Sequence, residues 1–218
     1  MIKAFIFDLD GTLIDSEVLW CKSLQRVIES RNLPITEAYT YELVFGRAWS
    51  DIVGRLRKDY PSLREDDGAL ELESLKHYRT LRGTTDIRIP SSIRLLERLA
   101  QRYPVAIVSG STRGQIADAI TMMGVTGKLK FYLGSEDYPR GKPDPLCFLL
   151  AAQRFGVEPA ECLVFEDSAA GVGAAKAAGM TCIALKLHGH AAQDVSTAAE
   201  ILTDLADFNA ARYGITLD

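Results

Sequence analysis

Short apolar runs, separated by longer segments in which apolar residues recur at helical spacing, dominate the pattern of this chain. The runs are rich in β-forming side chains and occupy residues 2–7, 105–108, 131–133, 163–165 and 182–185. A run that is apolar at every position is typical of a strand buried on both faces, as in a parallel sheet. We therefore predict that these runs are strands of one parallel sheet.

The segments between most of these runs predict helices. In residues 91–103, for example, Leu96 and Leu99 fall on the same helical face. Further helices are expected at residues 112–123, 145–155 and 168–178. Asp144 is the expected N-cap of the helix at 145–155, which has a proline in its first turn. Gly179 is expected to end the helix at 168–178. Strands that alternate with helices predict an α/β fold, a Rossmann-like parallel sheet flanked by helices and wound by right-handed crossovers.

One region interrupts this alternation. Residues 16–85 have no convincing strand pattern, and amphipathic helices are expected at residues 17–30, 37–45, 50–58 and 65–81. Because this excursion is far longer than an ordinary strand-to-helix connection, we interpret it as an inserted helical domain. The predicted division is a core domain of residues 1–15 and 86–218 and a helical domain of residues 16–85. The joints near residues 14–17 and 83–86 are the expected hinges.

Composition excludes several classes of partner. The chain has 218 residues, 47% apolar and 25% charged, which is an ordinary balance for a globular protein. Its net charge of −4 gives no electrostatic reason to expect nucleic acid or an anionic membrane as a partner. Four cysteines without metal-ligand spacing, and the absence of a signal-peptide pattern, favour free thiols in a cytoplasmic protein.

The first candidate for chemistry is the sequence DLDGT, which directly follows the first apolar run. Asp8 and Asp10 fall where the strand ends, and ligands bind at the carboxyl ends of strands in open parallel sheets. A turn of this kind after a strand is common, so this motif alone does not decide between a catalytic and a structural role. It is not a calcium loop, because Gly11 is fourth in the motif and an EF-hand requires glycine at the sixth position.

Two further signals follow the strands predicted at residues 105–108 and 131–133. The hydroxyl of Ser109 and the backbone N–H groups of Gly110 and Ser111 are suited to bind a phosphate oxygen, although a serine here is also compatible with a helix N-cap. In GKPDP, two prolines stiffen the loop around Lys142, whose ammonium group can neutralise an anion. A solvent-exposed lysine is the alternative.

The fourth signal is FEDS, where a predicted strand ends in Glu166 and Asp167. Adjacent carboxylates repel each other unless a cation lies beside them, although Asp167 or Ser168 is also compatible with a helix cap. The four signals together favour chemistry, because they all fall at one rim of the predicted sheet. Oxygen ligands without nitrogen or sulfur suit Mg²⁺, and phosphoryl transfer requires a nucleophile, positive charge on the phosphate oxygens and an acid for the leaving group.

The motifs DLDGT, VSGS, GKPDP and FEDS, in this order, resemble those of the haloacid dehalogenase superfamily, and the helical insert resembles its C1 cap. The similarity extends over essentially the whole chain and is greatest to the β-phosphoglucomutase and phosphoglycolate phosphatase-like branch. It implies that Asp8 is the nucleophile, forming an aspartyl-phosphate, and also a magnesium ligand. It implies that Asp10 is the general acid and base and ligates the metal through its carbonyl. Ser109 and Lys142 would be catalytic, and Asp167 with Glu166 would bind Mg²⁺.

Chemistry agrees with these roles, since an ordinary aspartate is ionised at neutral pH without help. Asp10 can protonate a leaving alkoxide and then deprotonate the hydrolytic water. Haloacid dehalogenases and phosphonatases resemble this pattern but lack the second acid, so Asp10 favours phosphate esters.

The inserted domain holds the candidate specificity residues Gly46, Arg47 and Trp49, in the sequence FGRAWSD. This segment resembles the substrate loop of β-phosphoglucomutases, which usually have G-x-x-R with an arginine that grips a second phosphate. Here Trp49 stands in place of that arginine, which argues against a mutase. Arg47 is equally compatible with binding an anionic substrate and with solvent exposure. Trp49 is compatible with covering an apolar or sugar surface and, more simply, with packing between helices.

The leading hypothesis is a Mg²⁺-dependent phosphatase, a phosphoric monoester hydrolase acting on a small phosphorylated metabolite such as a sugar phosphate or phosphoglycolate. The alternatives are a β-phosphoglucomutase-like sugar-phosphate mutase and a non-catalytic binding protein on the same scaffold. We expect a monomer or weak homodimer. His188 and His190 resemble a metal pair, but no third ligand is near in sequence, which favours a solvated loop.

Overall fold

The computed structural model describes residues 1–44, 49–187 and 193–217. These residues form two compact units. The first, called here the sheet unit, contains residues 1–14, 88–187 and 193–217. The second, the helical unit, contains residues 15–44 and 49–87.

The sheet unit is built on a six-stranded parallel sheet with the strand order β3-β2-β1-β4-β5-β6. The strands are β1 (Ala4–Phe7), β2 (Val105–Val108), β3 (Phe131–Leu133), β4 (Cys162–Glu166), β5 (Thr181–Leu185) and β6 (Glu200–Leu202). β1 and β2 are buried at every position, which explains why their sequences are apolar without alternation. The predicted fold class is confirmed.

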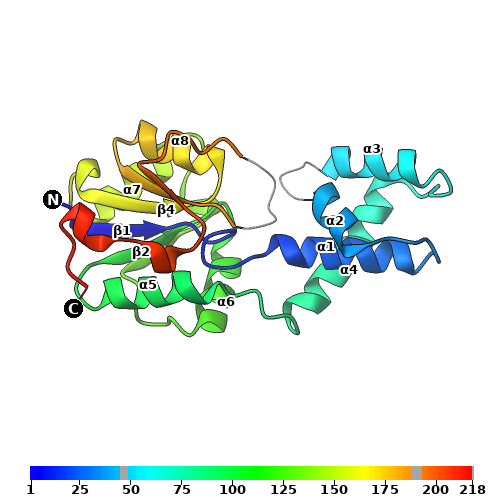
Figure 1. The fold of residues 1–218 in the computed structure, drawn as a ribbon, viewed down its shortest axis with the longest axis horizontal. Helices are drawn as coiled ribbons and strands as arrows, with labels where there is room; N and C mark the ends of the chain where they lie inside the picture. The colour runs from blue at the N-terminus through cyan, green and yellow to red at the C-terminus, as the bar shows by residue number, and fades with distance from the viewer. Residues whose placement is uncertain (45–48, 188–192, 218) are drawn as a thin grey trace. The chain divides into compact units, whose positions relative to one another are not determined.

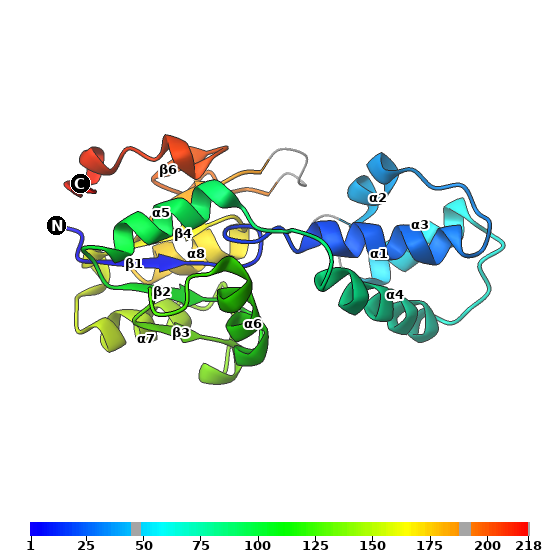
Figure 2. The ribbon, with the colours of Figure 1, turned by 90° about the horizontal axis from the view of Figure 1, so that it is seen from below.

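Helices cover both faces of this sheet. They are α5 (Pro90–Ala100), α6 (Arg113–Met123), α7 (Leu146–Phe155) and α8 (Ala169–Ala177). Figures 1 and 2 show α5 and α6 on one face and α7 and α8 on the other. Short 3₁₀ helices lie at Ser135–Asp137, Pro159–Glu161, Leu205–Asp207 and Ala210–Tyr213. β1 lies between β2 and β4, so the order of the strands reverses around it, and the carboxyl ends that flank this reversal are the usual place for a ligand site.

One strand was missed, and one predicted helix cap was wrong. β6 was not predicted, because it has three residues in an edge position and pairs only with β5 among the described strands. Asp144 is not the N-cap of α7: the helix begins at Leu146, with Pro145 in the cap position. The Asp144 carboxylate still accepts a hydrogen bond from the Leu146 N–H, at 3.0 Å, so it satisfies one of the amides at this end of the helix.

The helical unit consists of α1 (Glu17–Glu29), α2 (Glu37–Val44), α3 (Trp49–Asp59) and α4 (Asp67–Arg82). Its core is formed by apolar side chains of α1, α2 and α3, among them Leu24, Leu43 and Leu56. Buried serines also join α1 to α4, where the Ser23 hydroxyl donates to the Ser74 carbonyl oxygen. None of the described helices is long and apolar enough to cross a membrane.

Candidate active site at the carboxyl ends of β1, β2 and β4

Asp8 occupies the first position after β1 and is almost completely buried, with 6% of its surface exposed. Its N–H donates to the carbonyl oxygen of Phe165 in β4 at 2.9 Å, so the residue continues the register of the sheet. The ring of Phe7, the preceding residue in β1, stacks on the ring of Phe165 with centroids 4.5 Å apart. The Asp8 carboxylate is therefore held on a rigid part of the sheet.

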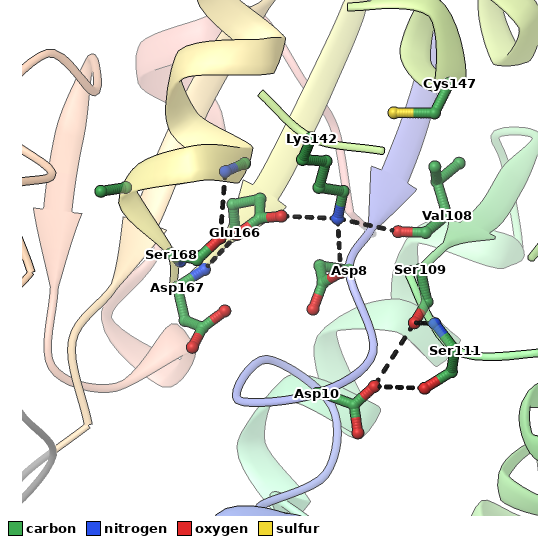
Figure 3. A network of polar contacts seen from close by, with 12 residues as sticks. Asp8, Asp10, Val108, Ser109, Ser111, Lys142, Cys147, Glu166, Asp167 and Ser168 are labelled. Atoms are coloured by element: carbon green, nitrogen blue, oxygen red, sulfur yellow. Dashed lines mark hydrogen bonds and ion pairs between the residues drawn. The ribbon is translucent and has the colours of Figure 1, made fainter. Parts of the chain in front are cut away.

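Lys142 reaches Asp8 from the loop before α7. Its ammonium nitrogen lies 2.5 Å from Oδ1 of Asp8 and 2.6 Å from Oε1 of Glu166, and it donates to the carbonyl oxygen of Val108 at 3.1 Å (Figure 3). Each of the three N–H groups of the ammonium therefore has a hydrogen-bond acceptor. The side chain is only 11% exposed, so this lysine is not a solvated surface residue.

Glu166, the last residue of β4, is fully buried and orders the turn that follows it. Its Oε2 accepts hydrogen bonds at 2.9 Å from the N–H groups of Asp167 and Ser168 and from the Ser168 hydroxyl. The same hydroxyl accepts from Gly171 and caps α8. Oε1 of Glu166 contacts Lys142, so both oxygens of Glu166 already have partners within the protein.

Two glycines make room for this acidic pair. A Cβ atom on Gly171 would lie 1.7 Å from Oε1 of Glu166, and one on Gly11 would lie 2.0 Å from Oδ2 of Asp167. Gly11 also has a positive φ of 81°, a conformation that favours glycine. The close approach of α8 and of the turn after Asp10 to the carboxylates therefore depends on these two residues. No local sequence signal marks Gly171 for this role.

The site offers oxygen ligands for a divalent cation. Carboxylate oxygens of Asp8, Glu166 and Asp167 lie within 4.8 Å of one another. Lys142 supplies one positive charge beside two of them, and all donors are hard oxygen atoms. This donor set fits Mg²⁺. Since both oxygens of Glu166 are engaged, Asp8 and Asp167 are better placed to bind a cation directly. Figure 3 shows the second oxygen of Asp8 pointing away from Lys142.

Asp10 lies on the opposite side of Asp8 from Glu166, and two hydroxyl groups hold it (Figure 3). Its Oδ2 accepts from the Ser111 hydroxyl at 2.8 Å and from the Ser109 hydroxyl at 3.4 Å. The Ser111 N–H in turn donates to the Ser109 hydroxyl at 3.0 Å. The Ser111 amide therefore already has an acceptor in this structure, and Gly110 is the better candidate of the two amides for a phosphate oxygen. The N-cap of α6 is Thr112, so Ser109 is not a helix cap.

Burial changes the acid–base chemistry of this cluster. It raises the pKa of Asp8 to about 8, although the Lys142 ammonium acts in the opposite direction. Burial lowers the pKa of Lys142, but Asp8 and Glu166 outweigh it and raise that pKa above the ordinary value. In the metal-free site, burial therefore favours the protonated form of Asp8, unlike an ordinary aspartate. A further positive charge at the site would favour the carboxylate.

Other predicted site residues lie elsewhere or outside the described residues. Gly46, Arg47, His188 and His190 belong to segments that the structure does not describe. Trp49 is the first residue of α3 in the helical unit. Its ring is half-buried against that unit's apolar clusters, and its indole N–H donates to the Asp67 carbonyl oxygen at 3.4 Å. Its observed contacts are thus those of a helix-packing residue.

Comparison with known proteins identifies the family. Residues 2–179 match the model of the haloacid dehalogenase-like hydrolases, which is well over half of the chain. This protein belongs to the haloacid dehalogenase-like hydrolases. The resemblance predicted from the four motifs is confirmed.

Individual members of the hydrolase family support this assignment. The chain is 29% identical over 208 residues to validoxylamine A 7'-phosphate phosphatase of Streptomyces hygroscopicus subsp. limoneus, covering 95% of this chain and 96% of that protein. It is 32% identical over 188 residues to hexitol phosphatase A of Escherichia coli, covering 84% and 82%. A putative β-phosphoglucomutase from Thermotoga maritima has the same fold, with a TM-score of 0.81 at 22% identity over 99% of this chain and 100% of that one.

Proposed function

We propose that this hydrolase is a Mg²⁺-dependent phosphatase that transfers the phosphoryl group of a small phosphorylated metabolite to Asp8 and then to water. The observation that carries the proposal is the buried Asp8 carboxylate, one oxygen of which contacts Lys142. Asp10 lies nearby and is held separately by a hydrogen bond from the Ser111 hydroxyl. Relatives named as phosphatases support hydrolysis of phosphate esters. A sugar phosphate or a small phosphorylated acid is the proposed substrate class.

The first step is attack of an Asp8 carboxylate oxygen on phosphorus. The bond between phosphorus and the ester oxygen breaks, and Asp10 donates a proton to the departing oxygen. Lys142 fixes the direction of Asp8, and the Ser111 and Ser109 hydroxyls fix that of Asp10. Mg²⁺, held by Asp8 and Asp167, would neutralise charge on the phosphate oxygens.

The second step releases phosphate. The Asp10 carboxylate, now without its proton, takes one from a water molecule as the water oxygen attacks phosphorus. The bond between phosphorus and the Asp8 oxygen breaks, inorganic phosphate leaves, and Asp8 and Asp10 regain their starting protonation. Glu166 acts by holding Lys142 and the turn after β4.

The helical unit is proposed to serve as the cap that selects the substrate, since the sheet-unit motifs address only phosphate and metal. No observation favours the mutase alternative. Trp49 stands where a mutase would have its arginine, and the contacts described for Trp49 lie within the helical unit. Cytoplasmic location and a monomeric or weakly dimeric state remain predictions from the sequence.

The test is release of inorganic phosphate from a panel of phosphorylated metabolites, with and without Mg²⁺. We expect at least one good substrate and a loss of more than about a thousandfold in kcat for Asp8→Asn. Asp207→Asn, an exposed acid on a 3₁₀ helix of the same unit, is the matched control and should keep full activity. Full activity of the Asp8 variant would contradict the proposal. Isomerisation of a hexose 1-phosphate primed by a bisphosphate, with slow phosphate release, would favour the mutase.

A further inference from the structure

Tyr138 lies just outside the residues assigned a chemical role, in the loop that leads from β3 to Lys142. Its ring is buried, with 7% of the residue exposed, in the same apolar cluster as Val108 and Phe148. Its hydroxyl donates a hydrogen bond of 2.6 Å to the carbonyl oxygen of Ser109. A buried tyrosine with one hydrogen-bond acceptor has little freedom to reorient.

This contact is one of a pair. Tyr138 and Lys142 donate to consecutive carbonyl oxygens, those of Ser109 and Val108, at the end of β2. The backbone before Tyr138 adds a third link, because the Ser135 N–H donates to the Ser111 carbonyl oxygen at 3.0 Å. The segment after β3 is therefore tied to the end of β2 and the loop that follows it at three positions.

The Ser109 carbonyl belongs to the same peptide group as the Gly110 N–H. In a planar trans peptide the two point in opposite directions, so a donor that fixes the carbonyl also fixes the N–H. Gly110 is exposed, and a Cβ atom built on it would meet no atom within 4 Å, so space is open around it. A hydrogen bond to the carbonyl also polarises the peptide and strengthens its N–H as a donor.

We propose that Tyr138 is a positioning residue that aims the Gly110 N–H at a phosphate oxygen of the substrate. The inference rests on the proposed phosphatase function and adds to it a residue that neither the motifs nor the metal cluster includes. Tyr138 touches no reacting atom in this account. It acts through the Ser109–Gly110 peptide, and it affects the binding of phosphate and not the binding of Mg²⁺.

The hydroxyl is suited to this task because it remains a donor at working pH. Burial raises the pKa of Tyr138 to about 12. Removing the hydroxyl leaves the ring in place and leaves the Ser109 carbonyl without this donor. The Ser109–Gly110 peptide is then less strongly restrained, and the direction of the Gly110 N–H is less well fixed.

The experiment measures binding of inorganic phosphate and of Mg²⁺ separately, by calorimetry, in the wild type and in Tyr138→Phe. We expect Tyr138→Phe to weaken phosphate binding roughly fivefold to twentyfold, with an unchanged stoichiometry and an unchanged Mg²⁺ dissociation constant. The kcat/KM for p-nitrophenyl phosphate should fall by at least the same factor. Tyr213→Phe is the matched control, since it also removes a hydrogen-bonded hydroxyl, one that donates to Glu200 at 3.0 Å, from the sheet unit.

Equal phosphate binding by the wild type and Tyr138→Phe would overturn the inference, as would a parallel loss of Mg²⁺ binding, which indicates general damage to the site. If Tyr138→Phe does not fold, 3-fluorotyrosine at position 138 replaces it, because the fluorinated hydroxyl is a stronger donor. Phosphate binding should then become tighter, and unchanged or weaker binding would contradict the inference. Failure of the wild type itself to bind phosphate would overturn the proposed function and this inference with it.

Discussion

The ammonium nitrogen of Lys142 lies 2.5 Å from Oδ1 of Asp8, although 134 residues separate them in the sequence. The same nitrogen lies 2.6 Å from Oε1 of Glu166, so one cation is shared between two buried carboxylates. Because a buried carboxylate is costly without a partner of opposite charge, Lys142 offsets the burial of both groups. The contact is therefore both a structural requirement of the sheet unit and, in the proposed function, the means of aiming the nucleophile.

Replacing Lys142 with methionine should destabilise the protein by about 3 kcal/mol or more, because it leaves Asp8 and Glu166 buried without their cation. It should also abolish phosphatase activity. Denaturant unfolding measures the first effect. Lys3→Met is the control: Lys3 pairs with Glu161 at 2.6 Å but is 57% exposed, so its loss should change the unfolding free energy far less. Equal effects of the two substitutions would contradict this account of the site.

Alanine at Gly171 should be poorly tolerated, while alanine two positions further along α8 should not. The added methyl group at Gly171 would overlap the Glu166 carboxylate, so we expect a loss of about 2 kcal/mol in unfolding free energy together with reduced activity. At Gly173 the nearest atom is 3.8 Å away, on Pro143, and alanine should be neutral or stabilise the helix by up to about 1 kcal/mol. Thermal unfolding of both variants distinguishes them. A Gly171→Ala protein as stable and active as Gly173→Ala would show that Glu166 is not held as described.

The Ser111 hydroxyl should matter for turnover rather than for binding. Its removal in Ser111→Ala takes away the shorter of the two hydroxyl contacts of Asp10 and keeps the longer one to Ser109, at 3.4 Å, so the acid is less well aimed at the leaving group. We expect kcat to fall about tenfold with a smaller change in KM. Ser135→Ala, which removes an exposed hydroxyl near Glu136, should leave both constants unchanged. A change confined to KM would mean that Ser111 binds substrate and does not orient Asp10.

Stability of the metal-free protein should depend on pH through Asp8. Its pKa is raised from 3.8 to about 8 on folding, so the folded state holds the proton that the unfolded chain releases. The stability contributed by this group is present below about pH 4 and is lost as the pH rises to about 8. The difference in unfolding free energy between the wild type and Asp8→Asn should therefore fall from about pH 5 to about pH 8 in EDTA.

Mg²⁺ provides the control for that measurement. Because cation binding requires the ionised carboxylate, Mg²⁺ should bind the wild type more tightly as the pH rises over the same range. A difference between wild type and Asp8→Asn that does not vary with pH would indicate that Lys142 keeps Asp8 ionised throughout.

The sequence was most informative where local chemistry and fold coincide. The apolar run before Asp8 and the run at 105–108 predicted strands that the structure contains, because strands buried on both faces have a continuous apolar sequence. Lys142 and Glu166 were found because they follow predicted strands or lie in an adjoining loop. Their contact with each other was not predictable, since it depends on the depth to which α7 and α8 pack on the sheet.

Other features had no local signal. β6 is a strand because β5 offers it hydrogen bonds at the sheet edge, and its three residues have no strand pattern of their own. Tyr138 lies in a polar loop, and only the fold brings its hydroxyl to Ser109. Gly171 is indistinguishable in sequence from Gly173, and the difference between them comes entirely from the position of Glu166.

Trapping the intermediate tests whether Asp8 attacks phosphorus. The wild type is quenched in acid during turnover of p-nitrophenyl phosphate with Mg²⁺, digested, and analysed by mass spectrometry. We predict a phosphoryl adduct on the peptide that contains Asp8, absent from the Asp8→Asn protein. Steady phosphate release by the wild type with no adduct at any time of quenching, or with an adduct on a different residue, would contradict it.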